Sequence, residues 1–230
     1  MTLKEFEESV GVMFKNEALL KQAFIHRSFI NENPRSGLVH NERLEFLGDA
    51  VLELVVTDFL YLAYPNHSEG DLTAYRSALV NAVTLGEVAD KLLFNDMMLL
   101  SKGEAKDVSR ARSSILADAY EAVVGAMYLD QGYDVAKDFI TRTVLIKTEE
   151  IIKNGLYKDA KSTVQEKAQE LLSVTPSYRV LAEEGPDHDK RFTVGIYFGE
   201  QKVTEGEGKS KQEAETAAAK KALEEKGWLR

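Results

Sequence analysis

Five carboxylates in two segments have the spacing of acids that share one side of a helix. Glu42, Glu45 and Asp49 stand at positions i, i+3 and i+7, which places them within about 60° of one another around a helix. Asp118 and Glu121 have the i, i+3 spacing further along the chain. If the two helices pack together, their carboxylates repel and cannot all ionise unless divalent cations bind between them. Ligands that are all oxygen atoms suit Mg²⁺ or Mn²⁺ better than zinc.

A simpler interpretation is that these acids face solvent or pair with basic side chains, as acids on helices usually do. Both segments are otherwise apolar, however, as Leu44–Leu52 and Ile115–Met127 show. A mostly buried helix leaves little room for a solvated acidic face, so the metal-site interpretation is favoured. Glu53 lies at the far end of the first face, and we expect it to reach solvent or an arginine instead.

Two histidines near the acids have simpler expected roles than catalysis. His26 lies beside Arg27 in the segment Phe24–Phe29, and for both we expect a hydrogen bond at a helix end rather than a catalytic role. His40 directly precedes the first acidic segment, and we expect it to be structural.

Composition narrows the class of protein. The chain of 230 residues has no cysteine, which excludes disulfides and thiolate metal sites and fits a reducing compartment. No apolar run approaches the length that spans a bilayer, and the acidic N-terminus does not resemble a signal peptide. We therefore expect a soluble cytoplasmic protein with no membrane partner. The net charge is −9, which argues against a nucleic-acid partner unless bound cations neutralise the acids.

The elements that must position the acids are helices. Apolar residues recur at helical spacing over roughly the first 150 residues, so residues 1–153 are predicted to form one helical domain. A short linker is predicted at 154–159. Breaks between helices are expected at 31–37, 64–70, 102–110 and 130–133.

The rest of the chain, residues 160–230, is predicted to be a smaller domain with the order α-β-β-β-α. Alternating apolar residues predict three strands, at 178–184, 192–198 and 201–207, after a helix at 162–172. In the closing helix, 210–226, Ser210 is a good N-cap, and Glu213 three residues later completes a capping box. Its alanines, Ala214, Ala217, Ala218 and Ala222, give a small-residue face that fits closely on a sheet.

Three spaced motifs resemble those of the ribonuclease III family. Glu42-Arg-Leu-Glu-Phe-Leu-Gly-Asp-Ala50 is similar to the family signature at all nine positions. Glu69-Gly-Asp-Leu-Thr73, with Arg76 and Leu79-Val-Asn81, resembles the next block, and Leu116-Ala-Asp-Ala-Tyr-Glu121 the third. The resemblance implies an all-α endonuclease domain followed by a small α+β double-stranded-RNA-binding domain.

The family resemblance also implies an activity. It is the Mg²⁺-dependent cleavage of double-stranded RNA to 5′-phosphate and 3′-hydroxyl ends, with Mn²⁺ as an alternative metal. The expected partners are double-stranded RNA and a second copy of the chain in a homodimer, with no small-molecule substrate. Processing of ribosomal RNA precursors and other structured transcripts is the family expectation.

Site residues follow from the resemblance by position. The implied metal ligands are Glu45, Asp49, Asp118 and Glu121, of which Asp49 and Glu121 are also catalytic. Glu42 and Glu69 are implied to be supporting catalytic acids.

Phe46 either belongs to the core or, by the family resemblance, fills a pocket of the partner subunit at the dimer interface. Gly48 beside it permits a close helix approach.

The RNA-binding residues are expected in three regions, because A-form RNA is recognised through its minor grooves, 2′-hydroxyls and phosphates. The first helix offers Thr163, Gln165 and Glu166 to one minor groove. The loop Gly185–Lys190 matches the family's Gly-Pro-x-His pattern and brings His188 to the next. The start of the closing helix offers phosphate ligands, Lys209, Ser210 and Lys211.

Two other classes of protein share some of these features. A non-catalytic double-stranded-RNA-binding protein with a degenerate nuclease core predicts that at least one of the four ligand acids is replaced, and none is. A helical Mg²⁺-dependent phosphohydrolase of nucleotides gives no reason for the C-terminal domain.

Overall fold

A computed structural model describes residues 1–106, 110–155, 157, 160–186 and 190–228. The chain divides into two compact units, Met1–Tyr157 and Lys158–Arg230. Within the described part of the chain, no helix combines the length and the apolar character needed to cross a bilayer.

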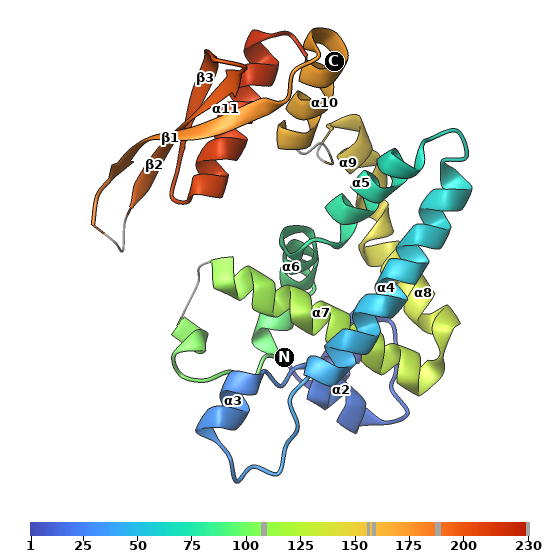
Figure 1. The fold of residues 1–230 in the computed structure, drawn as a ribbon. Helices are drawn as coiled ribbons and strands as arrows, with labels where there is room; N and C mark the ends of the chain where they lie inside the picture. The colour runs from blue at the N-terminus through green and yellow to red at the C-terminus, as the bar shows by residue number, and fades with distance from the viewer. Residues whose placement is uncertain (107–109, 156, 158–159, 187–189, 229–230) are drawn as a thin grey trace. The chain divides into compact units, whose positions relative to one another are not determined.

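The first unit is helical, as the apolar spacing predicts. Two long helices, α4 and α7, form its centre, and shorter helices surround them (Figure 1). Its elements are α1 (Leu3–Val10), α2 (Glu17–Ala23), α3 (Arg27–Glu32), α4 (Glu42–Ala63), α5 (Glu69–Val80), α6 (Ala82–Lys91), η1 (Phe94–Asp96), η2 (Glu104–Lys106), α7 (Arg110–Gln131), α8 (Tyr133–Thr143), η3 (Leu145–Lys147) and α9 (Thr148–Lys153).

Some helix boundaries differ from the prediction. A short 3₁₀ helix, η2, lies inside the predicted break 102–110, and the break at 130–133 shrinks to Gly132, whose positive φ of 88° turns the chain. The apolar spacing does not mark the break between α5 and α6. It occurs at Asn81, whose extended backbone lets its side chain accept a hydrogen bond from the Thr84 N–H at 2.9 Å and cap α6.

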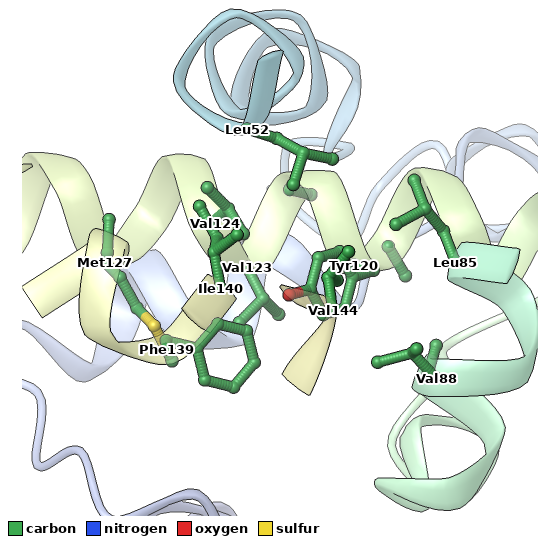
Figure 2. Packing of buried hydrophobic residues seen from close by; sticks show 14 of the residues in the cluster. Leu52, Leu85, Val88, Tyr120, Val123, Val124, Met127, Phe139, Ile140 and Val144 are labelled. Atoms are coloured by element: carbon green, nitrogen blue, oxygen red, sulfur yellow. The ribbon is translucent and has the colours of Figure 1, made fainter. Parts of the chain in front are cut away.

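The core of the first unit is built around α7. Tyr120, Val123, Val124 and Met127 of this helix are fully buried. Figure 2 shows the side chains that meet them: Leu52 from α4, Leu85 and Val88 from α6, Phe139 and Ile140 from α8, and Val144 just after α8. Because α7 is packed against other helices on several sides, the apolar core fixes the position of the helix and of the polar residues that it carries.

The second unit has the predicted α-β-β-β-α order. It consists of α10 (Ala160–Leu172), β1 (Pro176–Glu184), β2 (Arg191–Phe198), β3 (Gln201–Gly208) and α11 (Lys211–Glu225). The strands form an antiparallel sheet in the order β1-β2-β3. The register of β1 against β2 shifts between Val180 and Ala182, so Leu181 is the extra residue of a bulge.

Small residues bring α11 close to the sheet, as the alanine face predicts. Ala214, Ala218 and Ala222 are fully buried, as is Ala219, whereas Ala217 of the predicted face is partly exposed. On β3, a Cβ atom at Gly206 would lie 2.2 Å from the backbone nitrogen of Ala218. The buried Thr204 hydroxyl donates to the Ala218 carbonyl at 2.8 Å. This contact holds the middle of α11 against β3.

Candidate active site and RNA-binding surface

The acids are positioned by a close crossing of α4 and α7 (Figure 1). A Cβ atom at Gly48 would lie 1.7 Å from the backbone oxygen of Glu121, and one at Gly125 would lie 2.2 Å from that of Leu44. Each helix therefore presents a glycine to the backbone of the other, and no side chain separates them there. Gly48 fulfils its predicted role. Gly125 is not among the predicted residues, although a glycine inside the apolar run Val123–Met127 is a signal of close packing.

The crossing brings the two acidic pairs together. Glu45 and Asp49 flank Gly48 on α4, and Glu121 on α7 is the residue whose backbone touches that glycine. Burial, with the charges of Asp118, Glu42 and Asp49, raises the pKa of Glu45 to about 7. A raised carboxyl pKa with these causes indicates that several carboxylates are crowded into one partly buried space.

The acids of α7 are shifted in the same direction. Burial is again the largest cause for Glu121, and the charges of Asp49, Asp118 and Glu45 add to it, which raises its pKa to about 8. Burial and the charge of Glu42 raise the pKa of Asp118. Each of the four predicted ligand acids therefore takes part in the mutual repulsion.

The four predicted ligand acids have no positive partner among the ion pairs of the described residues. Crowded oxygen donors without counter-ions fit a hard divalent cation, which would favour the charged forms. In the described residues, no three carboxylate or imidazole groups converge closely enough to surround one ion. The chemistry of the donors, rather than their arrangement in this structure, is what fits a divalent cation.

The predicted supporting acids lie in different places. Glu42 is at the first position of α4, and its Oε1 lies 3.2 Å from Arg27 Nη1. Glu69 is exposed at the start of α5, and its carboxylate accepts a hydrogen bond from the Thr73 hydroxyl at 3.0 Å. Glu69 follows the far end of α4, a helix about 33 Å long at 1.5 Å per residue. Glu69 is also not among the charges that raise the cluster's pKa values, so the structure does not bring it to the cluster of its own chain.

Other residues near the acids have the simpler roles expected for them. Glu53 pairs with the Nε of Arg76 at 2.9 Å. His26 caps α3 by accepting a hydrogen bond from the Ser28 N–H at 3.3 Å. His40 places its Nδ1 3.6 Å from Glu42.

Phe46 is 80% exposed, although it lies on a helix with one fully packed face. The core interpretation of this residue is therefore wrong for the single chain. Leu54 and Tyr61 are also exposed on α4 and lie within about 80° of Phe46 at 100° per residue. This exposed apolar stripe on α4, formed by Phe46, Leu54 and Tyr61, is typical of a protein interface.

The predicted RNA-binding residues that the structure describes lie at or just before the starts of α10 and α11. On α10, Val164 is buried, Gln165 and Glu166 are exposed, and Thr163 is partly buried. His188 lies outside the described residues.

The start of α11 is capped as predicted, with one difference. Ser210 accepts a hydrogen bond from the Glu213 N–H at 3.1 Å, but the Glu213 carboxylate accepts from the N–H of Lys209, one residue before the cap. Lys209 and Lys211 are exposed. Lys211 also lies 3.1 Å from Glu183, so a phosphate must compete with that carboxylate for it.

Comparisons with known proteins agree with these features. Residues 16–148 match the family model described as "Ribonuclease-III-like", and residues 160–226 match the double-stranded RNA binding motif. A protein named Ribonuclease 3 from Carboxydothermus hydrogenoformans is 46% identical over 96% of this chain and 94% of its own length. The chain belongs to the ribonuclease III family. Ribonuclease 3 of Bdellovibrio bacteriovorus is similarly related, with 45% identity over 97% of this chain and 95% of its own.

A solved structure gives the same assignment for the first unit. The nuclease domain of ribonuclease III from Campylobacter jejuni matches with a TM-score of 0.57 and 38% identity, over 62% of this chain and 96% of that one. The protein is thus a double-stranded-RNA-specific endoribonuclease with an RNA-binding domain. The comparisons favour this enzyme over a non-catalytic RNA-binding protein.

Proposed function

We propose that this ribonuclease III uses Mg²⁺, with Mn²⁺ as an alternative, to cut double-stranded RNA into products with 5′-phosphate and 3′-hydroxyl ends. The observation that carries the proposal is the glycine-mediated crossing of α4 and α7, which gathers carboxylates that have no counter-ion among the described ion pairs. When bound by these acids, Mg²⁺ would supply an activated water for in-line attack and charge stabilisation at the leaving 3′-oxygen.

The chain's own residues hold and orient the reactants. Glu45 and Asp49 from α4 and Asp118 and Glu121 from α7 are the proposed metal ligands, of which Asp49 and Glu121 are also the proposed catalytic residues. The close crossing sets the spacing of the two pairs, and the apolar core beneath α7 keeps it fixed. Glu42 is proposed as a supporting acid. Glu69 lies too far from the carboxylate cluster of its own chain for its position to support a role there.

A homodimer is the proposed assembly. One chain provides one carboxylate cluster, and cutting both strands of a duplex requires two, which a two-fold dimer supplies with matching polarity. The exposed apolar stripe on α4 offers an interface, with Phe46 as its most exposed member. The Campylobacter jejuni nuclease-domain structure is described as having a region involved in dimer formation, which supports the same arrangement here.

The C-terminal domain is proposed to supply affinity for the duplex. Thr163, Gln165 and Glu166 would contact one minor groove, and His188 the next. Lys209, Ser210 and Lys211 would hold phosphates across the intervening groove. The pair between Lys211 and Glu183 weakens this domain's electrostatic contribution, because the lysine is partly neutralised before RNA arrives.

In the cell, we propose a cytoplasmic enzyme that processes ribosomal RNA precursors and other structured transcripts. The proposed division of the chain is a nuclease domain at 1–153, a linker at 154–159 and an RNA-binding domain at 160–230. The similarity of the chain to Ribonuclease 3 proteins over nearly its whole length supports this assignment.

The substrate class can be tested with one set of reactions. The protein is incubated with Mg²⁺ and a long RNA duplex, a single-stranded RNA of the same sequence, or nucleoside triphosphates. We expect only the duplex to be cut, with phosphate at the 5′ ends, and no cutting when EDTA is present. Hydrolysis of triphosphates with the duplex left intact would contradict the proposal.

A further inference from the structure

Arg27 places a cation at the rim of the acid cluster. Its Nη1 lies 3.2 Å from Glu42 Oε1, and its side chain remains 66% exposed. Glu42 in turn is close enough to Glu45 and Asp118 for its charge to raise the pKa of both. The guanidinium is therefore separated from the proposed metal ligands by a single carboxylate.

The backbone that carries Arg27 is fixed on two sides. The Asn41 N–H, at the start of α4, donates to the Ile25 carbonyl at 2.9 Å, and the His26 N–H donates to the Leu99 carbonyl at 3.1 Å. The Asn41 side chain is buried and donates to the Ala23 carbonyl at 3.1 Å. Arg27 thus extends from a tethered base, which holds a ligand-binding group more accurately than a free loop.

The negative charge of the acid cluster makes a nearby cation useful for binding RNA. An RNA strand is a polyanion, and its approach to a group of carboxylates is repulsive except where positive charge compensates. Among the ion pairs of the described residues, two permanent cations contact carboxylates that adjoin the ligand acids: Arg27 pairs with Glu42, and Arg76 pairs with Glu53 at 2.9 Å. Arg27 is the more exposed of the two side chains, at 66% against 34%, and is therefore the better placed to meet an incoming strand. A guanidinium has five N–H donors in a planar fork, and the contact with Glu42 uses one nitrogen, so donors remain for a phosphate.

We propose that Arg27 binds a backbone phosphate of the RNA strand that is cut, beside the scissile bond, and that Glu42 holds the guanidinium in place. This inference rests on the proposed assignment of the four ligand acids. It assigns a substrate-binding role to a residue outside the three acidic motifs.

A double-mutant cycle tests the proposal in the full chain. The variants are Arg27→Ala, Glu42→Gln and the pair, with cutting of a long duplex in Mg²⁺ measured at several salt concentrations. Binding of the same duplex is measured in the Glu121→Gln background. We expect Arg27→Ala to raise KM and weaken duplex binding about tenfold, and to have a smaller but still measurable effect in the Glu42→Gln background, where the guanidinium is no longer held in place. The slope of log affinity against log salt should become shallower by about one for each phosphate that is no longer bound.

Two controls separate a phosphate contact from general effects. Arg35→Ala removes another exposed arginine from the segment between α3 and α4, and it should change neither KM nor the salt slope. Arg27→Lys keeps the charge but not the fork, so it should keep the salt slope and recover only part of the affinity.

Several results would overturn the proposal. One is an unchanged KM and salt slope in Arg27→Ala. Another is a loss that disappears in the Glu42→Gln background, which would mean that Arg27 acts only through Glu42. A lowered melting temperature with unchanged RNA binding would show a structural role. Unimpaired cutting by Glu121→Gln would instead contradict the carboxylate assignment, and the binding and salt data would still decide the role of Arg27.

Discussion

Glu45 and Glu121 keep protons at a pH where ordinary carboxyl groups have released them. Their pKa values of about 7 and 8 stand above the usual 4.5 because burial and neighbouring carboxylates both penalise the charged form. Folding therefore confines charges that repel, and a bound cation relieves that repulsion. In this account, metal affinity and fold stability depend on the same residues.

This arrangement predicts how the stability of the metal-free protein depends on pH. Between pH 4.5 and about 8 the folded state binds more protons at these residues than the unfolded state does, so stability should fall as pH rises through that window. Below the window both states are protonated, and the penalty is absent. Added Mg²⁺ should therefore stabilise the protein more at pH 8 than at pH 5. Melting temperature across this range, in EDTA and in Mg²⁺, measures both effects.

Glu121→Gln provides the control, since other groups also titrate over this range. The variant should melt at a higher temperature than the wild type at pH 8 in EDTA, with a shallower pH dependence. Equal pH slopes for the two proteins would show that Glu121 does not titrate in this window.

At the scale of elements, the site depends on the contact between the α4 and α7 backbones. A Cβ atom at position 48 would lie 2.6 Å from the Glu121 carbonyl carbon as well as 1.7 Å from its oxygen. Gly48→Ala should therefore push the helices apart. It should lower the free energy of unfolding by about 1–3 kcal/mol and reduce cutting by separating the acidic pairs. Thermal unfolding and Mg²⁺-dependent cleavage measure the two effects.

Gly70→Ala is the matched control for this substitution. Gly70 lies in α5, and the nearest atom to its added Cβ would be the Ser68 hydroxyl oxygen at 3.8 Å, an ordinary contact. Because alanine favours helix, this variant should be as stable as the wild type or more so. Similar losses in both variants would contradict a specific role for the helix crossing.

What the sequence could predict follows from the range of the interactions. The faces that carry Glu45, Asp49, Asp118 and Glu121 are set by the helical repeat, which is local, and so is the cap at Ser210. The helices that carry these residues are therefore predictable from the sequence. The strand and helix boundaries in the second unit differ from the predicted ones by no more than about two residues for the same reason.

Other features depend on which elements meet, and the local pattern does not contain that information. The pairing of Gly125 with Leu44, the contact of Arg27 with Glu42 and the distance of Glu69 from the cluster all arise from tertiary packing. The contact of the Glu213 carboxylate with Lys209 instead of the predicted capping box reflects how the chain enters α11 from β3.

At the scale of the whole molecule, the proposed dimer depends on the exposed apolar stripe on α4. Phe46→Glu puts a charge where the account places an apolar contact, so sedimentation should shift toward the monomer. Ile146→Glu is the control, because Ile146 is 69% exposed on η3 and does not belong to the stripe. A Phe46→Glu protein that stays dimeric would remove this residue from the interface.

The most direct test of the central claim compares Mg²⁺-dependent cutting of a long RNA duplex by the wild type, Glu121→Gln and Glu53→Gln. Glu121 lacks a positive partner among the described ion pairs, whereas the neighbouring Glu53 is paired with Arg76. The account predicts that Glu121→Gln loses more than about 100-fold in cutting rate while still binding the duplex, because an anionic metal ligand is gone. Glu53→Gln should keep most of the activity. Cutting by Glu121→Gln at a near wild-type rate would contradict the assignment of this crossing as the metal-dependent active site.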